Sequence, residues 1–334
     1  MNKKVKSAGI IGIGSSVPEK TLTNKDLEKM VDTSDEWILK RTGISERRIL
    51  EKEEPASTLA IKAAKNALRS SGIDASEIDL IIVTTDTPDY LTPATACMVQ
   101  GAIGAVKAAA FDLNAACSGI VYGMTVAEQF IKNGYYKYIL VVACEGLTKV
   151  VDWEDRNTCV LFGDGAGAFM MGPVEDGYGM LSSEIGADGS SCKLITVPCC
   201  AITEDDLQKR AHENKRVLWM NGKEVFKFAV TIMPEATMRV MEKAKLKLED
   251  IKLIIPHQAN KRIIEGAIKR LQISKEKVYT CVQRYGNISS ASIPVALDEI
   301  VKACKIKKGD NIVLVGFGGG LTWAATIVKW SMNG

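Results

Sequence analysis

The sequence predicts an α/β protein made of two similar halves, each with a parallel sheet covered by helices. Two apolar, strand-like runs recur at a constant offset of 173 residues, at 80–82 and 253–255 and at 139–142 and 312–315. In each copy an amphipathic helical pattern precedes the second run, at 121–131 and at 294–304. Uniformly apolar strands that alternate with helices are typical of a parallel sheet buried on both faces. Chance agreement between apolar runs is the alternative to an internal duplication.

The repeat divides the chain into an N-terminal half, 1–174, and a C-terminal half, 175–334. The first half opens with an apolar run at 7–14 that predicts a strand. The segment 189–216 has no counterpart in the first half. Because it carries adjacent cysteines and many charges, we expect it to form a surface insertion.

Two short helices should follow the first strand. Thr23 precedes Asp26, and Thr33 precedes Glu36, each by three residues. A hydroxyl followed at this spacing by an acidic residue is the signature of an N-terminal helix cap, because each side chain can bind a free backbone N–H of the first turn. Thr23 and Thr33 are therefore the predicted caps.

Composition excludes several classes of protein. Of 334 residues, 46% are hydrophobic and 25% charged, and the formal net charge is +3, which rules out a disordered chain, a collagen and a strongly basic nucleic-acid binder. The long uncharged runs at 90–106 and 312–328 are interrupted by Pro93 and by four glycines, so we expect no membrane span. The N-terminus shows no apolar leader, which predicts a cytoplasmic protein.

Metal binding is not expected. The nine cysteines form no CxxC pair, and the only histidines are His212 and His257, so a structural zinc site is improbable and the compartment should be reducing. His212 lies in a charged run and is predicted to be a solvated helix residue.

Cys117 is the first candidate for chemistry. It follows a strand-like run at 111–114 and precedes a helical pattern, with small residues on both sides. A thiol at the start of a helix faces the positive end of the helix dipole, which favours the thiolate at neutral pH. A buried structural cysteine is the alternative.

His257 ends the second-half strand, and reactive groups of α/β sheets gather at the carboxyl ends of strands. The repeat aligns His257 with Thr84 and Cys117 with Ser290, so Asn287 lies three residues before the position that matches the thiol. A satisfied core imidazole and a simple turn asparagine are the alternatives.

The glycine-rich run 316–320 follows a strand and would let backbone amides approach a ligand closely, as in an oxyanion hole. A phosphate loop is the rival interpretation, but the GxGxxG and GxxxxGK[ST] patterns are absent. Gly12-Ile13-Gly14 lacks a third glycine and runs into Pro18, which argues against a dinucleotide site.

Four motifs in order resemble the β-ketoacyl-acyl-carrier-protein synthase III family. They are DLNAACSG at 112–119, PHQAN at 256–260, YGNISSASIP at 285–294 and GFGGGLTWA at 316–324. SDEWILKRTGISERR at 34–48 and FGDGAGA at 162–168 extend the resemblance to nearly the whole chain. It implies the thiolase fold, in which two similar halves stack as five layers, αβαβα.

The resemblance implies that Cys117 is the nucleophile that takes an acyl group from an acyl-coenzyme A. His257 and Asn287 would donate hydrogen bonds to the enolate formed when malonyl-acyl carrier protein loses carbon dioxide. Backbone amides of Cys117 and Gly319 would form the oxyanion hole. No cofactor is implied beyond the coenzyme A thioester substrate.

The resemblance also implies binding residues. Coenzyme A would contact an indole, two guanidinium groups and two residues along the pantetheine arm: Trp37, Arg41, Arg156, Gly222 and Asn260. The acidic carrier protein would meet a basic patch made of Lys227, Lys261, Arg262, Lys269 and Arg270. Phe317 and Thr92 would border the acyl pocket, with the Thr92 loop reaching across a homodimer interface.

The expected reaction is therefore a decarboxylative Claisen condensation that starts fatty-acid synthesis, with acetyl or a short branched acyl group as primer. Two alternatives remain open at this point. One is a related starter synthase that makes a polyketide, quinolone or long-chain ketone. The other is a thioester hydrolase that uses Cys117, His257 and Asn287 as a triad. A non-catalytic acyl-coenzyme A binder is disfavoured, because all three reactive positions are present.

Overall fold

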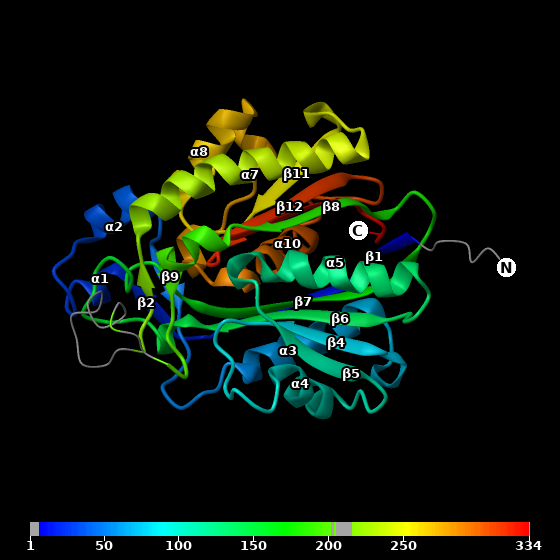
Figure 1. Ribbon diagram of the computed structural model, residues 1–334, viewed down its shortest axis with the longest axis horizontal. Coiled ribbons are helices and arrows are strands. Elements are labelled where there is room, and N and C mark those ends of the chain that lie inside the picture. The colour runs from blue at the N-terminus through cyan, green and yellow to red at the C-terminus, as the bar shows by residue number, and fades with distance from the viewer. Residues whose placement is uncertain (1–6, 202–203, 205–215, 334) are drawn as a thin grey trace.

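The computed structural model describes residues 7–201, 204 and 216–333, and its two large β-sheets are stacked with helices between and around them (Figure 1). The first sheet has the strand order β1-β7-β6-β4-β5. The strand bounds are β1 Ser7–Ser16, β4 Leu80–Thr84, β5 Ala109–Leu113, β6 Ile139–Gly146 and β7 Asp164–Val174. β4, β5 and β6 are parallel, whereas β7 is antiparallel to both β6 and β1.

The second sheet repeats this arrangement. Its order is β11-β12-β13-β8, and its bounds are β8 Gly179–Ala187, β11 Ile251–Pro256, β12 Asn311–Gly318 and β13 Thr322–Lys329. β11 and β12 are parallel, and β13 is antiparallel to both β12 and β8. These four strands match β4, β6, β7 and β1 in order and direction, which confirms the predicted pair of similar halves.

Helices fill three layers. α3 (Ser57–Ser71) and α4 (Thr95–Ile103) cover the outer face of the first sheet, and α7 (Gly222–Ala244) and α8 (Lys261–Leu271) cover that of the second. α5 (Gly119–Lys132) and α10 (Ser292–Lys302) lie between the sheets, where both contact strands of each sheet. The predicted five layers are confirmed (Figure 1). Buried apolar side chains of both sheets and both middle helices form one core, in which each fully buried Val, Leu, Ile, Met or Phe contributes about 1.5–3 kcal/mol by leaving water.

Short elements complete the fold. The helices α1 (Asn24–Leu27), α2 (Asp35–Thr42) and α9 (Val282–Tyr285) lie in connections. Two small antiparallel ribbons are also present. One pairs β2 (Thr21–Thr23) with β3 (Glu46–Arg48), and the other pairs β9 (Ile195–Thr196) with β10 (Trp219–Met220). Two 3₁₀ turns, η2 (Ala116–Ser118) and η7 (Ser289–Ala291), lead into the middle helices.

One predicted helix cap is confirmed and one is wrong. The Thr23 side chain accepts the Asp26 N–H, and Asp26 binds the Thr23 N–H at 3.1 Å, which completes a capping box. α2, however, is capped by Ser34, whose Oγ accepts the Trp37 N–H at 3.2 Å. Ser34 has the extended backbone of a cap, so the helix begins one residue later than the Thr33 cap would require.

The segment 189–216 is more than a surface insertion. η4 (Gly189–Leu194) and β9 lie in its first part, and Ile195 and Thr196 line the large cavity described below. Cys199 and Cys200 are exposed, with their Sγ atoms 3.9 Å apart. His212 lies outside the described residues. No helix within the described ranges is long and apolar enough to cross a bilayer.

Candidate active site

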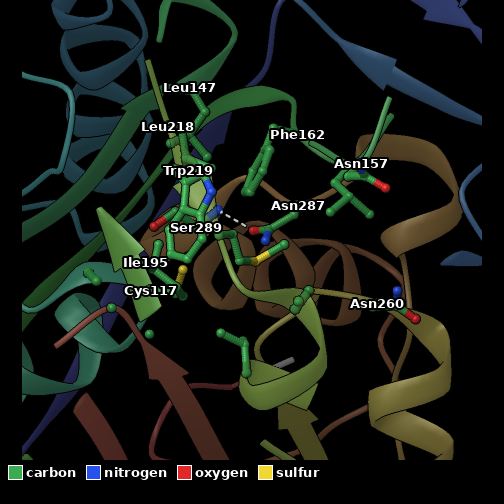
Figure 2. A pocket seen from close by; sticks show the side chains of 18 of the residues that line it. Cys117, Leu147, Asn157, Phe162, Ile195, Leu218, Trp219, Asn260, Asn287 and Ser289 are labelled. Atoms are coloured by element: carbon green, nitrogen blue, oxygen red, sulfur yellow. Dashed lines mark hydrogen bonds between the residues drawn. The ribbon is translucent and has the colours of Figure 1, made fainter. Parts of the chain in front are cut away.

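A cavity of about 1270 Å³ lies where the two halves meet. Its wall includes residues of β12 in the second sheet, residues that follow strands of the first sheet, and residues of the turns that lead into α5 and α10. Cys117, His257 and Asn287, which are far apart in the sequence, all line it. Figure 2 shows Cys117 and Asn287 at this cavity, among apolar side chains that include Phe162, Ile195 and Leu218. The structure therefore brings the three predicted catalytic residues to one space.

Cys117 lies in η2, between the end of β5 and the start of α5. The preceding residue, Ala116, has a left-handed backbone with φ of 48°. Gly318 of β12 makes room for this turn, since a Cβ atom there would lie 2.5 Å from the Cys117 backbone N. The backbone at Cys117 is thus packed closely against β12, while the Cys117 side chain lines the cavity.

The electrostatics of the thiol differ from the sequence-based expectation. Burial raises the pKa of the Cys117 thiol well above its usual range, and the neighbouring Asp86 carboxyl raises it further. The nearby Ser289 side chain acts in the opposite direction and lowers this pKa. Burial therefore favours the protonated thiol and opposes the thiolate that the helix N-terminus was expected to favour.

His257 follows β11 and is almost fully buried. Its backbone N–H donates to the Val315 carbonyl at 2.7 Å, and its Nδ1 lies 2.7 Å from Ser292 Oγ. The Phe317 ring packs edge-on against the imidazole at 5.4 Å between centroids. Burial lowers the pKa of His257 to about 3, so the ring is neutral at physiological pH.

The hydrogen bonds of Ser292 set the tautomer of this ring. Ser292 Oγ accepts the Gln258 backbone N–H at 3.2 Å, which directs the hydroxyl proton toward His257 Nδ1. Nδ1 then accepts, and the ring proton resides on Nε2. This arrangement makes His257 a hydrogen-bond donor toward the cavity that it lines.

Asn287 is fixed by its own backbone. Its N–H donates to the Leu161 carbonyl at 2.8 Å, and its carbonyl accepts the Gly163 N–H at 3.1 Å. Its side-chain Oδ1 accepts the Ser289 backbone N–H at 2.9 Å, the dashed line in Figure 2. Because Oδ1 is occupied, the amide Nδ2 is the group that can donate to a ligand. Gly163 permits this contact, since a Cβ there would lie 2.4 Å from the Tyr285 carbonyl.

The repeat provides an internal check on how the halves approach each other. Thr84 and Ser290 are the counterparts of His257 and Cys117, and their hydroxyls are hydrogen-bonded at 2.7 Å across the two halves. The strand end at Thr84 and the turn at Ser290 are therefore in direct contact. They are the repeat counterparts of the strand end at His257 and the turn at Cys117.

Most of the predicted coenzyme A residues lie at the cavity. Trp37, Arg41, Gly222 and Asn260 line it. Arg156 does not line it, but its guanidinium stacks on the Trp37 ring at 5.2 Å, as does that of Arg41. Asn260 caps α8 and donates from Nδ2 to the Arg41 carbonyl at 3.2 Å. Trp37, Arg41, Arg156 and Asn260 therefore form one connected group, and Gly222 lines the same cavity.

The other predicted residues are spread more widely. Lys227 and Arg262 line the cavity, while Lys261, Lys269 and Arg270 are exposed on α8 outside its lining. Phe317 and Gly319 also line the cavity. Thr92 is exposed and does not line the cavity of its own chain.

Sequence reasoning missed four polar residues next to the predicted trio. Asp86, Glu145, Ser289 and Ser292 all make hydrogen bonds at or beside the site. Asp86 could have been noticed, because it follows the end of β4 at the sheet edge where reactive groups gather. Glu145 carried the same signal, because it is a charged residue at the carboxyl end of the otherwise apolar strand β6. Among the described residues, no group of three or more His, Cys, Asp or Glu side chains could hold a metal ion.

Comparison with known proteins agrees with this geometry. The 3-oxoacyl-[acyl-carrier-protein] synthase III family model matches residues 111–189, and its C-terminal model matches 241–330. The chain is similar to the β-ketoacyl-[acyl-carrier-protein] synthase III of Caldanaerobacter subterraneus subsp. tengcongensis, with 52% identity over 325 residues that cover 97% of this chain and 98% of that protein. The protein of that name from Geobacillus kaustophilus is 54% identical over 323 residues, 97% of this chain and 99% of its own.

A solved structure gives the same result. The crystal structure of 3-oxoacyl-[acyl-carrier-protein] synthase III from Aquifex aeolicus superposes with a TM-score of 0.90 at 47% identity, and the match covers 97% of this chain and 100% of that one. The chain belongs to the β-ketoacyl-acyl-carrier-protein synthase III family of thiolase-fold enzymes, condensing acyltransferases that join an acyl-coenzyme A to malonyl-acyl carrier protein in fatty-acid synthesis.

Proposed function

We propose that Cys117, His257 and Asn287 carry out the two half-reactions of this condensation. In the first, the Cys117 sulfur attacks the acyl-coenzyme A carbonyl, a new S–C bond forms, and coenzyme A leaves as its thiol. Backbone N–H groups of Cys117 and Gly319 hold the tetrahedral oxyanion, a contribution of about 10²–10³ in rate per donor. The observation that supports these roles is the convergence of one thiol and two neutral hydrogen-bond donors on a single cavity.

In the second half-reaction, malonyl-acyl carrier protein loses carbon dioxide and the remaining enolate attacks the acyl-thioester. His257 donates from Nε2 and Asn287 from Nδ2 to the thioester oxygen as negative charge develops there. A neutral imidazole suits this task because it donates without adding a charge to the site. The condensation expels the Cys117 thiolate, which takes up a proton from water to regenerate the thiol, and gives the 3-oxoacyl carrier protein.

The substrates bind along the cavity and over α7 and α8. Trp37 and Arg156 take the adenine between an indole and a guanidinium, and Arg41 meets a phosphate. Gly222 and Asn260 follow the pantetheine arm into the cavity. The acidic carrier protein docks on the basic groups of these two helices, namely Lys227, Lys261, Arg262, Lys269 and Arg270.

The enzyme works as a homodimer. β5 is the edge strand of the first sheet, and its Phe111 side chain is exposed, as are those of Val106, Tyr90 and Leu91 nearby in the chain. An exposed apolar edge strand can pair with its copy in a second subunit. The Thr92 loop of one subunit then closes the acyl pocket of the other beside Phe317. The small Thr92 side chain leaves room for an acetyl or short branched primer.

Nine cysteines without a CxxC pair favour the reducing cytoplasm as the location.

Intact-mass measurement after addition of acetyl-coenzyme A tests the nucleophile. Wild type should gain one acetyl group, and Cys117→Ala should gain none. Cys304→Ala is the matched control, because Cys304 is exposed and lies outside the cavity lining. An acetyl adduct on Cys117→Ala would refute the assignment, and steady release of acetate without malonyl-acyl carrier protein would favour the hydrolase alternative.

A further inference from the structure

A pair of carboxyl groups, one fully buried and one half-buried, lies beside the candidate nucleophile and has no part in the condensation described above. Asp86 follows β4, and Glu145 lies in β6, where its side chain is fully buried. The Asp86 backbone N–H donates to Glu145 Oε2 at 3.1 Å, and Thr87 Oγ1 donates to the same oxygen at 3.0 Å. Asp86 lines the cavity together with Cys117.

Ser289 joins this pair to the thiol. Its Oγ donates to Asp86 Oδ2 at 3.1 Å, and its side chain is close enough to the Cys117 thiol to lower the pKa of that thiol. Its left-handed backbone, with φ of 47°, turns its side chain toward the first half of the molecule, where Asp86 lies. The hydroxyl thus lies beside the Cys117 thiol and is hydrogen-bonded to a carboxylate oxygen.

The two carboxyl groups differ in protonation. Burial, followed by the charge of Asp86, raises the pKa of Glu145 well above its usual range, so Glu145 is neutral. Burial also raises the pKa of Asp86, to about 6, although hydrogen bonds from Ser289 and Asn114 oppose the shift. Asp86 is therefore the ionised member of the pair at neutral pH.

The groups that face Asp86 come from four elements. Glu145 faces it from β6, Cys117 from η2, Ser289 from η7, and Asn114 from the connection between β5 and η2. No lysine, arginine or histidine is among the groups that shift its pKa in the described part of the chain. Asp86 is thus a carboxylate without a counter-ion, and it becomes more stable when it takes up a proton.

We propose that Asp86 accepts the Cys117 proton, through Ser289 Oγ, when the thiol attacks the acyl-coenzyme A. This inference rests on the proposed role of Cys117 as nucleophile. His257 is the other basic side chain at the cavity, but its Nδ1 is occupied by Ser292 and its Nε2 already carries the ring proton. Asp86 is the remaining base, and it is hydrogen-bonded to a hydroxyl that lies beside the sulfur.

The proton transfer is balanced at each step. The Cys117 S–H proton passes to Ser289 Oγ while the Ser289 proton passes to Asp86 Oδ2. The sulfur forms a bond to the acyl carbon, the bond from that carbon to the coenzyme A sulfur breaks, and the departing thiolate takes a proton back from Asp86. The site carries one negative charge before and after the transfer, so the reaction places no additional charge in it.

Rapid-quench intact-mass measurement of the acetylation rate between pH 5 and 9 tests this role. In wild type the rate should rise with pH as Asp86 ionises, with an apparent pKa near 6, and then level off. Asp86→Asn should reduce the rate about 10²-fold at pH 7 and remove this limb, because a general base contributes about 10²–10⁴. Ser289→Ala should give a similar loss, and the double variant should be no slower than either single one.

Two comparisons separate a proton-transfer role from a structural one. Malonyl-acyl carrier protein decarboxylation on a Cys117→Ala background reports the second half-reaction alone, and adding Asp86→Asn should change it far less than it changes acetylation. Asp74→Asn, a surface change on an exposed 3₁₀ turn, is the isosteric control. Equal losses in both half-reactions would show that Asp86 only maintains the shape of the site.

The possible failures can be told apart. If Asp86→Asn acetylates at the wild-type rate with the wild-type pH profile, while Cys117→Ala forms no adduct, the Asp86 inference is wrong and the nucleophile stands. If Cys117→Ala still forms the adduct, the proposed function itself fails.

Discussion

Ala116 and Ser289 occupy equivalent places in the two halves and share a left-handed backbone, with φ of 48° and 47°. They are 173 residues apart, the offset of the sequence repeat, and each begins a 3₁₀ turn that leads into a middle helix. The residue after Ala116 is the nucleophile Cys117, whereas the residue after Ser289 is Ser290. Duplication thus produced two copies of one strained turn, of which one holds the thiol and the other a hydroxyl.

The hydroxyl copy should contribute to stability. Ser290→Ala removes the 2.7 Å hydrogen bond to Thr84 and leaves a buried hydroxyl without its partner, which costs about 1–3 kcal/mol of unfolding free energy. Thr84→Val combined with Ser290→Ala should recover part of this loss, because neither partner then remains unsatisfied. Urea titration measures both effects, and equal stability of wild type and Ser290→Ala would contradict them.

Gly318→Ala should disable the nucleophile. A Cβ at this position would lie 2.5 Å from the Cys117 backbone N, so the turn must move, and a displacement of about 1 Å can cost 10²-fold in rate. Acetylation followed by mass spectrometry measures the loss. Gly101→Ala in α4 is the control, since a Cβ there meets no atom within 4 Å. Normal acetylation by Gly318→Ala would show that the turn is not held against β12.

His257→Ala and Asn287→Ala should each lower the rate of malonyl decarboxylation by about 10²–10³-fold, the usual effect of losing one oxyanion donor, and should spare acetylation.

The pH dependence of decarboxylation tests the neutral state of His257. Because the pKa of His257 is lowered to about 3, the ring stays neutral from pH 5 to 8, and it should add no titration near 6.5 to the decarboxylation rate of Cys117→Ala. A histidine-like limb in that profile would contradict a neutral donor.

Trp37→Ala should raise the KM for acetyl-coenzyme A by about 3- to 30-fold with a smaller change in kcat, since a stacked guanidinium and aromatic ring contribute about 0.5–2 kcal/mol. Trp37→Phe keeps a ring and should recover part of the binding. Steady-state kinetics measure both, with Tyr135→Ala as an exposed aromatic control. An unchanged KM would place the adenine elsewhere.

Phe111→Lys should disrupt the homodimer, because it puts a charge on the exposed edge strand β5. Analytical ultracentrifugation should show a monomer at concentrations where wild type is a dimer. Tyr135→Lys adds the same charge at another exposed apolar position and should leave the dimer intact. A dimeric Phe111→Lys would move the interface away from β5.

Much of the architecture could be predicted from local patterns. The runs at 80–82 and 139–142 are fully buried strands, as their uninterrupted apolar character implied, and the 173-residue offset identified both their copies and the equivalence of Cys117 with Ser290. Motifs that combine a thiol, an imidazole and a carboxamide identified the trio that lines the cavity. Boundaries were less certain: α2 begins after Ser34, because either of two adjacent hydroxyl residues could have capped it.

By itself, the sequence determined the two-fold α/β plan and the three side chains of the candidate site, since periodicity, caps and motifs are properties of neighbouring residues. Only the tertiary structure decided the protonation of that site and the contacts around it. Ser289 meets Asp86 from 203 positions away, and burial, rather than the helix dipole, controls the Cys117 thiol. Such effects depend on which groups lose water together, and that is fixed by how the two sheets pack rather than by the order of the residues.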